Sequence, residues 1–144
     1  MSEETEAKVL LEKYLRDSHV FNLATAVNGQ PSNRDMFYIV PENFTDTIYA
    51  TTPHDAPKLG EILLNPNVSI TTVPTDEDHG VVTSNTAQAK ISELKIDDVL
   101  DLLADQIPQW SATVGDGKDE FVVIEIKMPT VKIFGTQGIS SIKL

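Results

Sequence analysis

Few residues of this chain could hold an anion, because it carries two arginines, Arg16 and Arg34, and nine lysines against 22 acidic residues. Arg34 stands at the start of an apolar run, where an arginine is unfavourable to bury without an anion. A dianionic phosphate is held best by a guanidinium, an ammonium, a hydroxyl and a helix N-terminus. Arg34, Lys58, Thr51 and a helix expected to begin near Pro57 could supply all four.

The same residues also fit a purely structural interpretation. Arg34 could lie at the solvent end of its strand and pair with one of the many acids. Lys58 could be a solvated lysine in a first helical turn, and Thr51 an ordinary strand threonine. The residues by themselves leave both interpretations open.

Other kinds of chemistry find little support in the sequence. The absence of cysteine excludes disulfides, thiolate metal sites and a cysteine nucleophile. The three histidines, His19, His54 and His79, stand in loops or next to the ends of expected elements and show no metal-ligand spacing. His79 follows Glu77 and Asp78, which could hold a hard cation, although a solvated acidic loop is the simpler interpretation. No phosphate-binding glycine motif occurs. We therefore expect neither a catalytic side chain nor a metal site.

Composition and charge narrow the class of protein further. A length of 144 residues predicts a single domain, 1–144, and a formal net charge of −11 argues against a nucleic-acid partner. The N-terminus is acidic rather than basic and apolar, and no segment approaches the roughly 20 apolar residues of a membrane span. The sequence therefore predicts a cytoplasmic protein without a membrane partner.

The elements that must position these side chains are mostly short strands. Asn28-Gly29 is a strong hairpin signal between two apolar runs, and prolines close several of the others. Apolar periodicity predicts helices over 3–17, 58–64 and 96–107, the last ended by Pro108. Expected strands cover 20–27, 32–40, 48–51, 68–73, 81–91, 121–128 and 131–134, with a possible edge strand at 138–144 and a polar loop at 75–80. Six or seven strands with peripheral helices indicate a small α+β barrel.

Four segments together resemble a known cofactor-binding architecture. They are Arg34 with the strand that follows it, Tyr49-Ala50-Thr51-Thr52, Ala56-Pro57-Lys58, and Asn65-Pro66-Asn67-Val68. The chain resembles the FMN-binding split barrel superfamily, which includes pyridoxamine 5'-phosphate oxidase and small general-stress and nitroimidazole-resistance relatives. The resemblance covers roughly the first two-thirds of the chain. It implies a split β-barrel of six to seven mostly antiparallel strands.

The resemblance also implies roles for individual residues. Arg34 and Lys58 would contact the FMN phosphate, and Thr51, in preference to Thr52, would hold phosphate or ribityl oxygens. The isoalloxazine ring would be flanked by the strand segment Met36, Phe37 and Tyr38, with Gln88 reaching the flavin edge.

The chain departs from the family pattern at three places. Ala56 stands where the family has a phosphate-binding serine, and Asn85-Thr86-Ala87-Gln88 lacks the family's glycine. No arginine follows Arg34, so the Arg-x-His substrate motif of pyridoxamine 5'-phosphate oxidase is absent and oxidation of that substrate is not expected. Trp110, the lone tryptophan, could stack on a flavin or substrate but more often such a residue packs in a core or interface.

The function implied by the resemblance is that of a homodimeric flavoprotein. FMN would bind between the subunits, and the protein would act as an oxidoreductase on a small organic substrate. Three alternatives remain open: a non-catalytic flavin-binding sensor or carrier, a haem-handling relative with His19, His54 or His79 as a ligand, and a barrel that has lost its cofactor.

Overall fold

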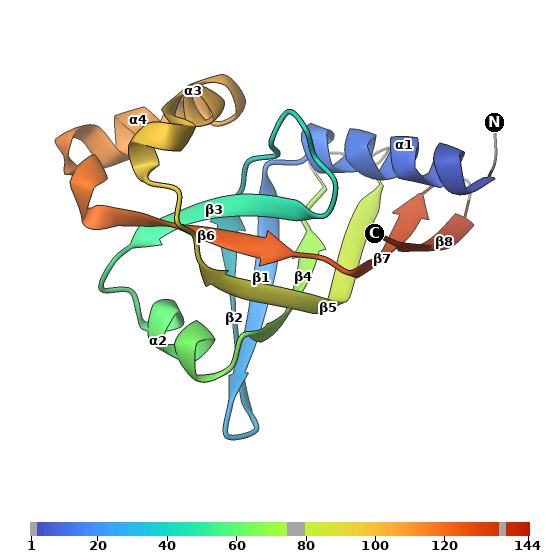
Figure 1. Ribbon diagram of the computed structural model, residues 1–144, viewed down its shortest axis with the longest axis horizontal. Helices are drawn as coiled ribbons and strands as arrows, with labels where there is room; N and C mark the ends of the chain where they lie inside the picture. Colours follow the sequence, from blue (N-terminus) through green and yellow to red (C-terminus); the bar gives the residue numbers. More distant parts are fainter. Residues whose placement is uncertain (1–2, 75–79, 136–137) are drawn as a thin grey trace.

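A computed structural model describes residues 3–74, 80–135 and 138–144 of the chain. They form an α+β fold in which a curled antiparallel sheet is flanked by short helices (Figure 1). In chain order the elements are α1 (Glu3–Asp17), β1 (Val20–Val27), β2 (Gln30–Phe37), β3 (Thr47–Pro53), α2 (Pro57–Leu64), β4 (Asn67–Thr72), β5 (Val81–Ile91), α3 (Ile96–Gln106), α4 (Pro108–Val114), the 3-10 helix η1 (Gly115–Glu120), β6 (Phe121–Lys127), β7 (Thr130–Gly135) and β8 (Gly138–Lys143). The expectation of a split β-barrel with few helices is confirmed.

Six strands form the barrel, and their order is β2-β1-β4-β5-β6-β3. Its two ends meet where Ile39, just beyond β2, forms an antiparallel bridge with Tyr49 of β3. The backbone nitrogens and carbonyl oxygens of these two residues exchange hydrogen bonds of 2.8 and 3.1 Å. β7 pairs with β5 and with β8, which extends the sheet away from this closure.

The second strand differs from its expected range of 32–40. It begins at Gln30, directly after the Asn28-Gly29 turn, and its ladder with β1 ends at Phe37. Beyond that point Ile39 pairs with β3 instead of β1. The chain changes partner because the barrel must close here, and an apolar pattern cannot reveal such a change.

Alternating side chains divide the apolar residues into two cores. Within the barrel, β1 contributes Phe21 and Leu23, both fully buried. The second core lies on the outer face of β3 and β6, where Ile39 and Val123 pack against α3 and α4. Figure 1 shows these two helices together at one corner of the molecule, away from α1.

Tyr14 of α1 contacts the residue that precedes β5 and the last residue of β7. Its ring lies against Gly80 and Gly135, and a Cβ atom at either glycine would overlap it. Glycine is therefore required at both positions by close approach. The polar loop expected at 75–80 lies outside the described residues except for Gly80.

The helix ended by Pro108 is followed by a second helix that was not expected. α3 ends at Gln106 and α4 begins with Pro108 at its first position. Proline is compatible with a helix start because its missing N–H would have no intrahelical partner there. α4 places Trp110 in the second core, where its ring is 5.9 Å from that of Phe121 in an edge-on arrangement.

Among the described residues, no helix is long and apolar enough to cross a bilayer.

Candidate functional site

Arg34 lies on the interior face of β2, because it pairs with Leu23 of β1. Its Nη1 donates to the Leu23 carbonyl at 3.3 Å and to Thr25 Oγ1 at 3.1 Å. Its Nη2 donates to both carboxylate oxygens of Glu61, at 3.1 and 3.2 Å. The side chains of Arg34 and Glu61 are only 22% and 23% exposed. Arg34 is therefore a half-buried cation whose charge is compensated by the Glu61 carboxylate of α2.

Lys58 approaches the same place from the first turn of α2. Its Nζ donates to Thr52 Oγ1 at 3.0 Å. Burial lowers the pKa of Lys58, and the nearby Arg34 charge lowers it further, while Glu61 opposes both effects. Glu61 thus forms an ion pair with Arg34 and acts on Lys58 through its charge, and we call Thr25, Arg34, Thr52, Lys58 and Glu61 the cationic cluster.

The helix α2 holds Lys58 and Glu61 on one side because they are three positions apart. Leu59 and Ile62 are buried and fix the helix to the barrel, where it packs against β1 and β5. Asn65 at the end of α2 donates its Nδ2 to the Ala26 carbonyl at 2.9 Å. Ala56, extended at the N-terminal cap, provides no side-chain hydrogen bond there.

The two threonines of β3, of which Thr51 was the preferred candidate, point to opposite faces of the strand. Thr51 lies on the outer face and accepts a 2.8 Å hydrogen bond from Trp110 Nε1. Thr52 is buried on the inner face beside Lys58. The alternation of a strand allows only one of two successive side chains to reach the cluster, and that one is Thr52.

The segment expected to flank a flavin ring is divided between core and surface. Met36 and Tyr38 are buried in the barrel core, and Phe37 is 41% exposed. Tyr38 donates its hydroxyl to the Leu15 carbonyl at 2.6 Å, and burial raises its pKa. Of these three side chains, only that of Phe37 is therefore exposed to a ligand.

Gln88 lies apart from the cationic cluster. It is exposed on the outer face of β5, with its Nε2 3.4 Å from Asn67 Oδ1. It lines a hollow of about 460 Å³ together with Asp46, Lys90, Glu125 and Lys127.

Two members of the cationic cluster, Thr25 and Glu61, were not expected from the sequence. The three-residue spacing between Lys58 and Glu61 was the available signal for the glutamate. Thr25 is separated from Arg34 by the hairpin, and only the register of β1 with β2 brings them together.

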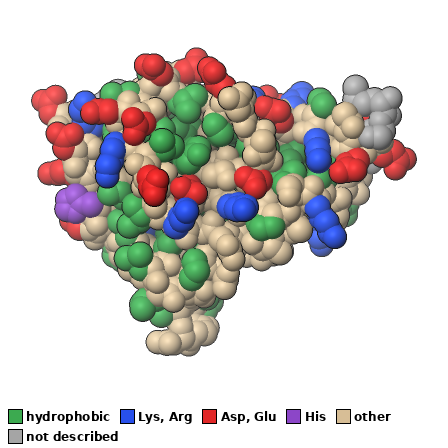
Figure 2. All heavy atoms as spheres, viewed as in Figure 1, with side chains coloured by type: hydrophobic (Ala, Val, Ile, Leu, Met, Phe, Trp, Pro, Cys, Tyr) green, Lys and Arg blue, Asp and Glu red, His purple; other side chains and the backbone are tan. Residues whose placement is uncertain are grey.

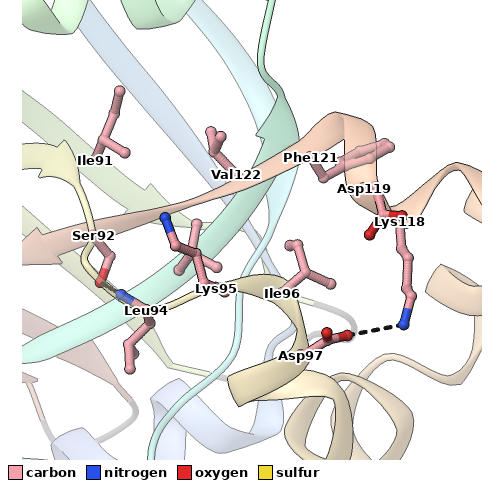
Figure 3. Close-up of a pocket in the computed structure, with 11 residues that line it drawn as sticks. Ile91, Ser92, Leu94, Lys95, Ile96, Asp97, Lys118, Asp119, Phe121 and Val122 are labelled. Carbon is pink, nitrogen blue, oxygen red and sulfur yellow. Dashed lines mark hydrogen bonds and ion pairs between the residues drawn. The ribbon is translucent and has the colours of Figure 1, made fainter.

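A cavity of about 410 Å³ lies between the end of β5, the start of α3, η1 and the start of β6. Figure 3 shows Ile91, Val122 and Phe121 along its apolar wall, with Asp97 and Lys118 at one side. Val122 is the ladder partner of Thr52, so the cavity and the cluster are neighbours. Lys118 is bound to Asp97 at 2.9 Å, so the two charges there compensate each other.

Among the described residues, no three His, Cys, Asp or Glu side chains are grouped so that they could hold a metal ion. His19 is half-buried and His54 is exposed. His79, with Glu77 and Asp78, lies outside the described residues. Acidic side chains are spread over the face of the molecule that Figure 2 shows, with several near α3. The cationic cluster is therefore a local exception in an acidic protein.

An antiparallel barrel into which a half-buried arginine from β2 and a lysine from α2 converge defines a split-barrel protein with a cationic cluster. The chain belongs to the pyridoxamine 5'-phosphate oxidase-like family, which matches residues 14–139. No curated protein matches the sequence.

Solved structures share this fold at low sequence identity. General stress protein 26 from Bacillus anthracis is 18% identical, with a TM-score of 0.72 over 96% of this chain and 99% of that one. A protein related to general stress protein 26 from Clostridium acetobutylicum is 13% identical, with a TM-score of 0.69 over 95% of both chains. A heme binding protein from Mycobacterium smegmatis is 17% identical, with a TM-score of 0.72 over 99% of this chain and 58% of that one.

Proposed function

We propose that this protein binds FMN and that the cationic cluster receives the FMN phosphate. The observation that carries the proposal is the convergence of Arg34 and Lys58, from different elements, on a half-buried site that also contains the Thr52 hydroxyl. A guanidinium, an ammonium and a hydroxyl are the donors that a phosphate dianion requires. In an acidic chain with two arginines, such a pairing is a specific feature.

The protein's own groups would act by binding and orientation. Arg34 and Lys58 would fix the phosphate, Thr52 would orient the Lys58 ammonium, and the exposed Phe37 ring would cover one part of the isoalloxazine. Thr51 and Gln88 remain weaker candidates, because they lie on outer faces of β3 and β5. When bound, the flavin supplies the hydride or electron chemistry. No side chain is proposed as a general base.

A cytoplasmic homodimer acting on a small organic substrate is the assembly and activity that we propose for this flavoprotein. Exposed leucines on α2 support the dimer: Leu63 and Leu64 are 71% and 76% exposed. They follow the cluster residues on the same helix, so a second subunit seated there would lie close to the cofactor. Sedimentation at several concentrations tests this part directly.

The decisive experiment is a titration of the purified protein with FMN and, separately, with riboflavin, followed by flavin fluorescence. Binding of FMN that exceeds binding of riboflavin supports a phosphate site. Protein that takes up neither flavin overturns the proposal.

Haem binding is the second candidate. The heme binding protein of Mycobacterium smegmatis shares this fold, and the exposed His54 directly follows β3. Added haem that produces a Soret band shifted by His54→Ala would favour this function over the first.

A further inference from the structure

We propose that Glu61 is an internal counter-ion of Arg34 that a phosphate must displace, so that Glu61 sets how strongly the site binds phosphates. The inference deepens the proposed function and rests on the same cluster. It concerns the competition between a protein carboxylate and a ligand anion for one guanidinium.

The contacts of Arg34 show why displacement is needed. Both terminal nitrogens are engaged within the protein: Nη1 by Leu23 and Thr25, and Nη2 by both oxygens of Glu61. A phosphate that binds the guanidinium through its terminal nitrogens must therefore replace one of these acceptors.

Glu61 is the acceptor that can move. The Leu23 carbonyl belongs to β1, which is paired on both sides by β2 and β4 and cannot leave the sheet. Thr25 is 3% exposed and held inside the barrel. The Glu61 side chain projects from a short helix and is 23% exposed. Apart from Arg34 it is held by a 3.3 Å hydrogen bond from Thr25 Oγ1, and its rotatable bonds allow it to turn toward solvent once these contacts are exchanged.

Charge favours the exchange for a phosphate dianion. Arg34, Lys58 and Glu61 together carry one positive charge, and a dianion attracts the two cations more strongly than a single carboxylate does. The remaining Glu61 charge then lies near the bound phosphate and repels it. Glu61 therefore weakens phosphate binding while it stabilises the protein by neutralising Arg34.

The test compares the wild-type protein with Glu61→Gln, which removes the charge and keeps the shape. Glu42→Gln is the matched control, because it makes the same change at an exposed position in the loop between β2 and β3. Each protein is titrated with inorganic phosphate at constant ionic strength, read by thermal unfolding, and with FMN and riboflavin, read by fluorescence.

We expect E61Q to unfold at a lower temperature without ligand and to bind phosphate and FMN about tenfold more tightly, as for one charge-assisted interaction. Riboflavin affinity should stay unchanged, and E42Q should behave as wild type. A lower unfolding temperature without tighter phosphate binding would show a merely structural role and overturn the inference.

The inference and the proposed function fail separately. Unchanged or weaker FMN binding by E61Q, with a wild-type protein that binds FMN, overturns only the role of Glu61. If the protein binds no FMN but E61Q binds inorganic phosphate more tightly than wild type, only the proposal of FMN binding is contradicted. If E61Q does not fold, Glu61→Asp shortens the carboxylate and should likewise tighten phosphate binding; an equal or lower affinity contradicts the inference.

Discussion

Gln106 of α3 and Val40 form a closed pair of hydrogen bonds. The Gln106 Nε2 donates to the Val40 carbonyl at 2.7 Å, and the Val40 N–H donates to Gln106 Oε1 at 2.8 Å. The side-chain amide thereby satisfies both backbone groups of Val40, as a neighbouring strand would, in the segment that follows β2. Since Val40 is 1% exposed, water cannot easily replace these bonds.

Replacing Gln106 with Ala should lower the free energy of unfolding by about 2 kcal/mol, because it leaves two buried backbone groups of Val40 without their partner. The neighbouring exposed Asp105→Ala should change it by less than about 0.5 kcal/mol. Denaturant unfolding with a constant m value measures both. Equal effects of the two changes would contradict a special role for Gln106.

Replacing Arg34 with Ala should weaken FMN binding by roughly 10- to 150-fold, corresponding to about 1.5–3 kcal/mol for a charge-assisted hydrogen bond. Riboflavin affinity should not change. Arg16→Ala is the matched control, because Arg16 binds Glu12 and the Pro41 carbonyl at the end of α1. If R34A bound FMN with the affinity of wild type, Arg34 would not be part of the FMN site.

The two threonines of β3 offer a matched comparison of nearly equal shape. Thr52→Val should weaken FMN binding about fivefold, since Lys58 loses its hydroxyl partner, a loss of about 1 kcal/mol. Thr51→Val should leave FMN affinity unchanged and destabilise the fold by about 1–2 kcal/mol, because the buried Trp110 N–H loses its acceptor. If Thr51→Val weakened FMN binding and Thr52→Val did not, Thr51 rather than Thr52 would belong to the FMN site.

The lowered pKa of Lys58 predicts a pH dependence. Phosphate binding needs the ammonium, so FMN affinity relative to riboflavin should fall as pH rises through a pKa below the ordinary lysine value of 10.5. Lys58→Met should bind FMN more weakly and lack this step. For stability the sign is opposite: between the lowered pKa and the unfolded value the unfolded chain binds more protons, so stability should rise with pH in that window.

Alanine at Gly80 or Gly135 should destabilise the fold by about 1–3 kcal/mol, because the new methyl group would overlap the Tyr14 ring. Gly60→Ala is the control: nothing lies near its added methyl, and it should gain up to about 1 kcal/mol in helix propensity. In a Tyr14→Ala background the Gly135→Ala cost should shrink. An unchanged cost in the double mutant would show that the overlap is not with Tyr14.

Short-range patterns in the chain were sufficient to predict most of the helices and strands. The Asn28-Gly29 turn with its flanking apolar runs predicts β1 and β2, and periodicity predicts α1 and α3, because turn geometry and burial act over a few residues. The selection of Arg34 and Lys58 depended on the family resemblance, and composition narrowed the candidates because a chain with 11 basic residues has few that can bind an anion.

The partners of those cations depended on contacts between distant segments. Strand register places Thr25 beside Arg34, helix docking brings Glu61 to the same guanidinium, and the orientation of β3 selects Thr52 over Thr51. The closure of the barrel likewise decides that β2 ends at Phe37. Local sequence specifies which faces are apolar, but the identity of a neighbour across the sheet is decided by how the whole chain buries those faces together.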